Sequence, residues 1–190
     1  RELGLPSEPL WLNQVHGCAV LRTLPDTSQG CTADAAVSVT PGRICVVLTA
    51  DCLPLLLCDR SGTRIAAVHA GWRGLLHGVI EAALDSLSAP GPEVLCWLGP
   101  AIGPQAFEVG DEVRAAFVQR DPPAVAAFLP SPTGRWLADI YALARRRLQA
   151  RNVGFVGGGG WCTVTDSSRF FSYRRDTVTG RMASLIWIEP

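Results

Sequence analysis

The chain has 190 residues, which is enough for a domain that buries its own core, and we expect a single domain over residues 1–190. Hydrophobic residues make up 48% of it and the 17 basic residues balance the 17 acidic ones, which excludes a disordered chain and a basic nucleic-acid-binding protein. All 17 basic residues are arginine, which excludes a lysine Schiff base and the lysine of a phosphate-binding P-loop.

Short apolar runs in the first third of the chain predict β-strands. They lie at residues 10–12, 19–21, 35–39, 44–49, 53–58 and 65–68. Residues 59–62, Asp-Arg-Ser-Gly, are typical of a turn between the last two runs. The stretch from 44 to 58 is almost wholly apolar, which indicates strands that are covered on both faces.

Helical spacing of apolar residues begins at residue 75 and continues to residue 87, and Ala-Pro-Gly at 89–91 ends this predicted helix. A strand at 94–98 and helices at 113–128 and 136–148 follow. The four glycines at 157–160 predict a linker, and residues 184–188 predict a closing strand. Because strands and helices alternate irregularly, we expect an α+β fold with mixed sheets.

No run of about 18 uncharged apolar residues and no basic-then-apolar leader occurs, so we expect a cytoplasmic protein that does not enter a membrane. The seven cysteines are an odd number without a Cys-x-x-Cys pair, which favours free thiols over a disulfide framework. The chain begins with Arg1 and its single methionine is Met182, so we expect that an N-terminal segment is missing.

Three residues with metal-binding or nucleophilic side chains lie at ends of predicted strands, beside glycine or proline: His16, Cys52 and His69. Such positions bring side chains to a cleft while the backbone leaves room for a ligand. Two imidazoles and a thiolate can hold zinc and leave a fourth position for water or substrate. Their long separation along the chain leaves two other interpretations open. In one, Cys52 packs as a small core residue and the two histidines hydrogen-bond to backbone carbonyls. In the other, Cys52 is the nucleophile and His69 the base of a cysteine hydrolase.

Three further residues are candidates for the same site. Asp51 precedes Cys52 and either stabilises a turn or shares the site, since neighbouring side chains on a strand point to opposite faces. Asp34 is an isolated carboxylate in apolar surroundings, with the same two interpretations. Arg73 lies between two glycines at the start of the predicted helix, where it either holds a phosphate or carboxylate or forms an ion pair.

The chain resembles the YfiH family, also described as laccase-domain or multicopper polyphenol oxidoreductase proteins, through five blocks in the same order. The blocks are Asn-Gln-Val-His-Gly at 13–17, Thr-Ala-Asp-Cys-Leu-Pro at 49–54, His-Ala-Gly-Trp-Arg-Gly at 69–74, Gly-Pro-Ala-Ile-Gly at 99–103 and Phe-Phe-Ser-Tyr-Arg-Arg-Asp at 170–176. The resemblance extends from residue 10 to residue 188. Family members carry a longer segment ahead of the first block than this chain does.

This resemblance implies mixed β-sheets packed together with helices outside, in four α/β/β/α layers. It implies a zinc centre with the ligands His16, Cys52 and His69. The implied activity is phosphorolysis of adenosine, inosine and S-methyl-5′-thioadenosine to the base and ribose 1-phosphate, together with deamination of adenosine. The implied partners are therefore a small nucleoside and phosphate, with no nucleic acid and no membrane, and the oligomeric state is left open.

For this chemistry we assign catalytic roles to Cys52, Asp51 and Arg73, and substrate binding to Arg73 and Asp34. A zinc-activated water would attack the adenine ring in deamination, with Asp51 as the first candidate for proton transfer and Asp34 as the second. In phosphorolysis, Arg73 is expected to hold the phosphate.

Three other functions stay open: a cysteine hydrolase that uses Cys52 and His69, a copper polyphenol oxidase, and a peptidoglycan editing factor like other members of the resembled family. Copper is the alternative cofactor and the less suited one. The chain has only three histidines, and its single methionine, the usual weak axial ligand of a blue-copper site, lies near the C-terminus.

Overall fold

A six-stranded mixed sheet forms the centre of the computed structural model, which describes residues 4–24 and 27–190. Its strands, in spatial order, are β1 (Val20–Arg22), β2 (Ala35–Ser38), β5 (Ile65–Ala70), β4 (Leu53–Asp59), β6 (Val94–Leu98) and β10 (Phe155–Gly158). The two outer pairs, β1–β2 and β6–β10, are parallel, and the three inner pairs are antiparallel. The hairpin of β4 and β5 therefore lies in the middle of the sheet.

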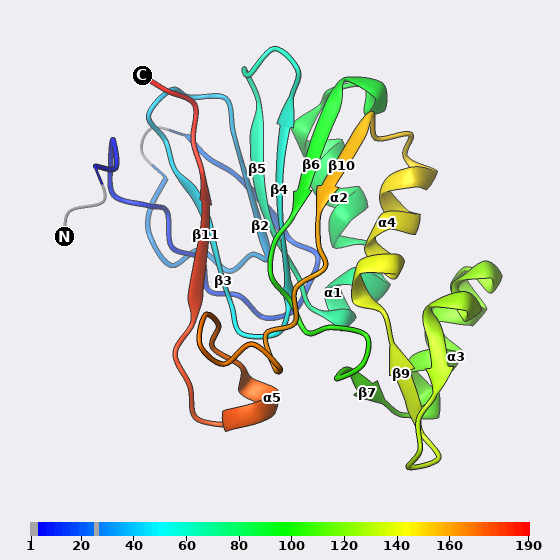
Figure 1. Ribbon diagram of the computed structural model, residues 1–190. Coiled ribbons are helices and arrows are strands. Elements are labelled where there is room, and N and C mark those ends of the chain that lie inside the picture. The colour runs from blue at the N-terminus through cyan, green and yellow to red at the C-terminus, as the bar shows by residue number, and fades with distance from the viewer. Residues whose placement is uncertain (1–3, 25–26) are drawn as a thin grey trace.

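Helices cover one face of this sheet and a second sheet covers the other (Figure 1). The helices are α1 (Trp72–His77), α2 (Val79–Leu87) and α4 (Ile140–Ala150), and the main hydrophobic core lies beneath them. The second sheet consists of β3 (Cys45–Thr49) and β11 (Met182–Ile186), which pair antiparallel. Val47 of β3 and the alternate β5 residues Ile65 and Ala67 form a smaller apolar cluster between the two sheets. Side chains on this face of β5 thus point between the sheets.

A small third unit extends from one end of the molecule (Figure 1). It contains the strands β7 (Glu108–Val109), β8 (Phe128–Pro130) and β9 (Trp136–Ala138), the helix α3 (Asp111–Arg120) and the 3₁₀ segment η2 (Pro122–Ala127). Another 3₁₀ turn, η1 (Gly91–Glu93), precedes β6, and the four-residue helix α5 (Tyr173–Asp176) precedes β11.

The expected α+β class with mixed sheets is confirmed, and three of its layers are seen in the part of the chain that the structure describes: helices, six-stranded sheet and two-stranded sheet. The expected strand at 10–12 is instead an extended segment whose Leu10 forms an isolated bridge to Cys45. The expected glycine linker at 157–160 is partly strand, because Gly157 and Gly158 pair with β6. The closing strand lies at Met182–Ile186 rather than at 184–188.

The predicted helices are shorter than their apolar patterns indicated. The helix at 75–87 begins earlier, at Trp72, and is divided at Gly78, whose positive φ of 103° breaks the helical path. The predicted helix at 113–128 ends at Arg120, since two prolines follow and lead into η2 and β8. In the predicted helix at 136–148, the first three residues form β9, and Asp139 caps the helix by accepting a hydrogen bond from the Ala142 N–H.

None of the helices in residues 4–24 and 27–190 is long and apolar enough to cross a bilayer.

The turn between β4 and β5 is organised by one carboxylate. Asp59 accepts hydrogen bonds from the hydroxyls of Ser61 and Thr63, at 2.6 and 2.7 Å, and from the backbone N–H groups of Thr63 and Arg64, at 2.7 and 2.9 Å. Burial opposes ionisation of Asp59, but these hydrogen bonds outweigh it and lower its pKa to about 2. The ionised Asp59 therefore stabilises the central hairpin.

Replacing Asp59 by Asn retains the shape of the side chain but removes the charge to which these groups donate. We expect the free energy of unfolding at pH 7 to fall by about 1–3 kcal/mol. The carboxylate contributes fully above its usual pKa of 3.8 and loses its contribution as the pH falls toward its folded value of about 2. Urea unfolding of both proteins at pH 7 and near pH 2 measures this, and a deficit of equal size at both pH values contradicts the assignment.

Candidate metal centre

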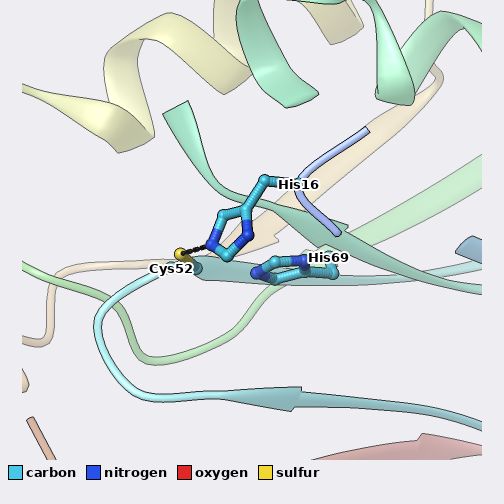
Figure 2. A group of neighbouring side chains, drawn as sticks. All are labelled: His16, Cys52 and His69. Carbon is cyan, nitrogen blue, oxygen red and sulfur yellow. Dashed lines mark hydrogen bonds between the residues drawn. The ribbon is translucent and has the colours of Figure 1, made fainter. Parts of the chain in front are cut away.

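His16, Cys52 and His69, which lie far apart in the sequence, converge at one end of the two sheets (Figure 2). One donor atom of each lies within 4.8 Å of the others. The Cys52 Sγ lies 3.6 Å from the His16 Nε2, and the two imidazole rings meet edge to face with centroids 4.7 Å apart. The predicted ligand set is therefore one cluster in space.

The backbone explains how each residue reaches this cluster. His69 lies near the end of β5, on the same face as Ile65 and Ala67, so its ring points between the sheets. Cys52 is the last residue of the turn that connects β3 to β4. His16 comes from the loop before β1 and adopts a positive φ of 61°.

Asp34 holds two of these residues in place. Its Oδ1 lies 2.8 Å from the His69 Nδ1, which leaves the Nε2 of that ring for the cluster. The same carboxylate accepts backbone N–H groups of Val15, His16 and Gly17, at 3.3, 2.9 and 2.6 Å. One buried carboxylate therefore orients a histidine on β5 and also fixes the loop that carries the other histidine.

The structure places Asp34 differently from its assigned role in substrate binding. Its side chain has no exposed surface, and it is not among the residues that line the adjoining cavity. Burial opposes its ionisation, but hydrogen bonds from His69, Gly17 and His16 outweigh this and lower its pKa. This placement favours a positioning role for Asp34, behind the histidines.

Gln14 has a structural role that the sequence analysis did not assign. Its side-chain amide donates to the Leu48 carbonyl and accepts from the Leu48 N–H, both at 2.8 Å, as a neighbouring strand would. It thereby attaches the loop of His16 to the free edge of β3. The sequence gives little indication of this role, because the partner of Gln14 is a backbone group, which every residue has.

Two glycines let this loop approach α1 closely. A Cβ at Gly71 would lie 2.7 Å from His16 Cδ2 and 3.0 Å from Cys52 Sγ. A Cβ at Gly74 would lie 2.8 Å from the backbone carbonyl oxygen of Gly17. The glycines of the block at 69–74 are therefore required by the packing around the cluster.

Asp51, which precedes Cys52, faces another part of the chain. It adopts a positive φ of 88°, and its carboxylate accepts hydrogen bonds from the Thr163 hydroxyl and the Arg174 N–H, at 2.5 and 2.6 Å. Both carboxylate oxygens thus hold the segment that contains α5. Asp51 also lines the cavity, and its assignment to proton transfer stays a prediction.

A cavity of about 630 Å³ adjoins the cluster. Its lining residues include the cluster itself, Asp51 and apolar residues such as Trp72, Ile102 and Phe107. Three arginines, Arg73, Arg174 and Arg181, also line it, and all three are exposed. Sequence reasoning assigned only Arg73 to the site, because the positions of the other two depend on how the C-terminal segment folds back.

The Arg73 guanidinium stacks on the Trp72 ring at 4.5 Å, and no hydrogen-bond or ion-pair partner for it occurs within residues 4–24 and 27–190. The expected alternative, a surface ion pair of Arg73, is therefore absent from this part of the chain. The other two arginines donate to backbone carbonyls: Arg174 to Glu108 and Arg181 to Thr179 and Gly180. Arg73 is thus the most available of the three cations.

The histidines favour the thiolate form of Cys52. Burial raises the pKa of this thiol, but hydrogen bonds and charge interactions with His16 and His69 lower it to about 7. Burial disfavours the charged form of His69, but its hydrogen bonds to Asp34 and Cys52 raise its pKa to about 9. The two shifts favour a thiolate at Cys52 and a protonated ring at His69, which hydrogen-bonds to the buried Asp34.

The donor set fits a zinc ion. Tetrahedral coordination with Zn–S and Zn–N bonds of about 2.3 and 2.0 Å separates sulfur from nitrogen by roughly 3.5 Å, and the Cys52–His16 separation is 3.6 Å. The pairing of Asp34 with His69 is the carboxylate–histidine arrangement that commonly supports such sites. Three protein ligands leave one position for a substrate or water.

The family model described as multi-copper polyphenol oxidoreductase laccase matches residues 1–189. A protein named purine nucleoside phosphorylase from Pseudomonas aeruginosa is 59% identical over 186 residues, which cover 97% of this chain and 76% of that protein. The purine nucleoside phosphorylase YfiH of Escherichia coli is 54% identical over 185 residues, which also cover 97% of this chain and 76% of the relative.

Solved structures with the same fold agree with these sequence matches. A Neisseria meningitidis protein of the family DUF152 has a TM-score of 0.92 and 49% identity, and the match covers 96% of this chain and 76% of that one. YlmD from Geobacillus stearothermophilus has a TM-score of 0.86 and 26% identity, covering 95% and 73% of the two chains.

Replacing Cys52 by Ala removes the only sulfur ligand of the cluster. We expect the purified variant to contain no stoichiometric zinc while remaining folded, because Cys52 is a half-buried residue that belongs to neither hydrophobic cluster. Elemental analysis together with circular dichroism measures this. A Cys31→Ala variant, which changes a partly exposed cysteine outside the cluster, is the control. One zinc per chain in Cys52→Ala would refute the ligand assignment.

Replacing Asp34 by Asn should weaken zinc binding by about 10–100-fold, because a neutral amide supports the His69 ring less well and disturbs the His16 loop. Competition with a chromogenic chelator measures this affinity. Asp166→Asn, which changes an aspartate outside the cluster, should bind zinc like the unmodified protein. Equal affinity in all three proteins contradicts the positioning role.

Proposed function

We propose that this chain, which belongs to the multi-copper polyphenol oxidoreductase laccase family, is a zinc-dependent purine nucleoside phosphorylase. The curated relatives above are purine nucleoside phosphorylases by name, which supports a purine nucleoside enzyme. The observation that carries the proposal is a His-Cys-His cluster that opens into a cavity with exposed arginines around it. The proposed substrates are adenosine, inosine and S-methyl-5′-thioadenosine, with phosphate as the second substrate.

In phosphorolysis, a phosphate oxygen forms a bond to the anomeric carbon of the ribose while the bond from that carbon to the purine nitrogen breaks. The base leaves with the electron pair and takes up a proton, and ribose 1-phosphate remains. The sugar acquires positive charge in between, so the enzyme must hold an anion close to the anomeric carbon. A cation-lined cavity suits this requirement.

The charges of the cavity favour an anion. Of the lining residues, the three arginines are cationic, and Asp51 is the carboxylate, whose oxygens are already hydrogen-bonded to the C-terminal segment. Arg73 is exposed, and its guanidinium carbon lies over the Trp72 ring. We therefore assign the phosphate to Arg73, with Arg174 and Arg181 contributing to the positive potential.

The cluster residues would hold the zinc ion through the Nε2 atoms of His16 and His69 and the thiolate of Cys52. When bound, zinc supplies a Lewis acid that polarises an oxygen or a water molecule. Adenosine deamination is proposed as a second reaction of this site. In it, water adds its oxygen to C6 of the purine, ammonia leaves, and Asp51 carries the proton between them.

A cysteine hydrolase is the second candidate function, and one observation favours it. Cys52 Sγ contacts an imidazole nitrogen of His16, and its pKa is lowered to about 7, as in activated nucleophiles. The contact of 3.6 Å involves His16, whereas the sequence analysis paired Cys52 with His69 as the base. This candidate would be supported if alkylation of the Cys52 thiol blocks turnover even in protein from which the metal has been removed and replaced.

The copper polyphenol oxidase and the peptidoglycan editing factor stay as predictions from the resemblance. An oxidase would oxidise phenols only when loaded with copper, and a binding factor would retain metal without turnover. Cytoplasmic location and a lack of nucleic-acid or membrane partners likewise stay as expectations.

Phosphate dependence tests the proposed reaction directly. We expect zinc-loaded protein to convert adenosine to adenine and ribose 1-phosphate only when phosphate is present, because phosphate is the nucleophile. Chromatographic separation of the products with and without phosphate measures this. The Cys52→Ala variant is the control for contaminating activity. If inosine is the sole product in both conditions, the proposed deaminase activity is supported and the proposed phosphorylase activity is refuted.

Replacing Arg73 by Gln should raise the KM for phosphate about tenfold, since one charge-assisted contact is lost, while the KM for adenosine changes less. Steady-state kinetics with each substrate varied in turn measure the two constants. Arg60→Gln changes an exposed arginine on the β4–β5 turn and is the matched control. An unchanged KM for phosphate in Arg73→Gln assigns the anion to another residue.

A further inference from the structure

Thr49 is a buried polar residue in the lining of the cavity. Only 2% of the residue is exposed, yet it lines the cavity beside the metal cluster. Its Oγ1 has no hydrogen-bond partner among residues 4–24 and 27–190. A hydroxyl that is buried without a partner destabilises the protein, so a residue of this kind in a cavity points to a ligand that completes its hydrogen bonds.

The strand places this hydroxyl on the inner side of the site. Thr49 ends β3 and follows the alternation of Cys45 and Val47, whose side chains lie in the apolar cluster between the sheets. His69 extends from the opposite sheet on the face that borders the same layer. Thr49 therefore lies at the buried floor of the cavity, beside the layer between the sheets.

The polar residues that line the cavity differ in exposure and charge between its floor and its rim. The three lining arginines are exposed and form a cationic rim, whereas Thr49 and His69 are buried, with 2% and 3% exposed. A phosphate dianion is best neutralised at the rim, where guanidinium groups reach it. An uncharged hydroxyl, which both donates and accepts, matches an uncharged hydroxyl of the ligand.

We propose that the Thr49 hydroxyl binds a ribose hydroxyl of the nucleoside and so orients the sugar between the metal cluster and the phosphate at the arginine rim. This inference rests on the proposed purine nucleoside function and names one contact that would select a ribose. It makes Thr49 a specificity-determining residue, since the sugar analogue without that hydroxyl leaves Thr49 unpaired.

Thr49→Val tests this contact, because valine has nearly the same shape and lacks only the hydroxyl. We expect kcat/KM for adenosine to fall about tenfold, which is the effect of one lost hydrogen bond. Zinc content should match that of the unmodified protein, and thermal stability should be equal or higher, since valine removes a buried hydroxyl that no group within residues 4–24 and 27–190 pairs with. Thr49→Ser should restore most of the activity because it restores the oxygen.

Deoxyadenosines that lack the 2′ or the 3′ hydroxyl identify the partner; the 5′ hydroxyl is no candidate, because the proposed substrate S-methyl-5′-thioadenosine lacks it. The unmodified enzyme should discriminate against the analogue that lacks the contacted hydroxyl. Thr49→Val should lose that discrimination while treating the other analogue as the unmodified enzyme does. Thr23→Val is the matched control. Thr23 is also 2% exposed with an unpartnered hydroxyl, but it does not line the cavity.

Titration calorimetry with the same nucleosides separates this inference from the proposed function. If the unmodified enzyme phosphorolyses adenosine and Thr49→Val has equal kinetics and selectivity, the contact is refuted and the function stands. If no turnover occurs but adenosine binds and Thr49→Val weakens that binding selectively, the contact stands and the function is refuted. Absence of both binding and turnover in the unmodified protein overturns both.

Discussion

The site depends on one buried carboxylate. Asp34 has no exposed surface, so its charge must be compensated within the protein, and His69 together with three successive backbone N–H groups provides that compensation. The same interactions bring a ring from the central sheet and a loop from the N-terminal region to a common point. The two histidines of the cluster are therefore brought together by the pairing of one buried charge.

A second carboxylate connects this cluster to the rest of the cavity. Asp51 adjoins the ligand Cys52 but directs its oxygens to Thr163 and Arg174, so the turn that carries the sulfur ligand also anchors the C-terminal wall. The positive φ of Asp51 turns the backbone so that the Asp51 side chain reaches the C-terminal segment while the Cys52 side chain reaches the histidines. Arg175 then holds that wall together by donating to the carbonyls of Thr163, Val164 and Phe170. Metal cluster and arginine rim are thus parts of one connected structure.

The sequence pattern predicted structure correctly where it depends on residues close in the chain. It failed where the structure depends on contacts with residues far away in the chain. The buried strands around 44–58 and 65–68 were recognisable because they are apolar, and the central hairpin turn because of its Asp-Arg-Ser-Gly sequence. The helices were predicted too long because the apolar spacing continues across Gly78 and across the prolines after Arg120, where the backbone cannot follow it. Residues such as Arg181 were missed because their place depends on a strand pairing across the whole chain.

The sequence by itself determined which side chains are available: three histidines, seven cysteines, and cations that are all arginine, with the candidate ligands placed near glycine or proline at strand ends. The blocks that resemble a family also indicated the ligand set. Only the tertiary structure decided that Asp34 lies behind His69 rather than in the cavity, and that the Thr49 hydroxyl finds no partner in the part of the chain that the structure describes. The reason is that hydrogen bonding and burial are properties of residues brought together by folding, and no local pattern records them.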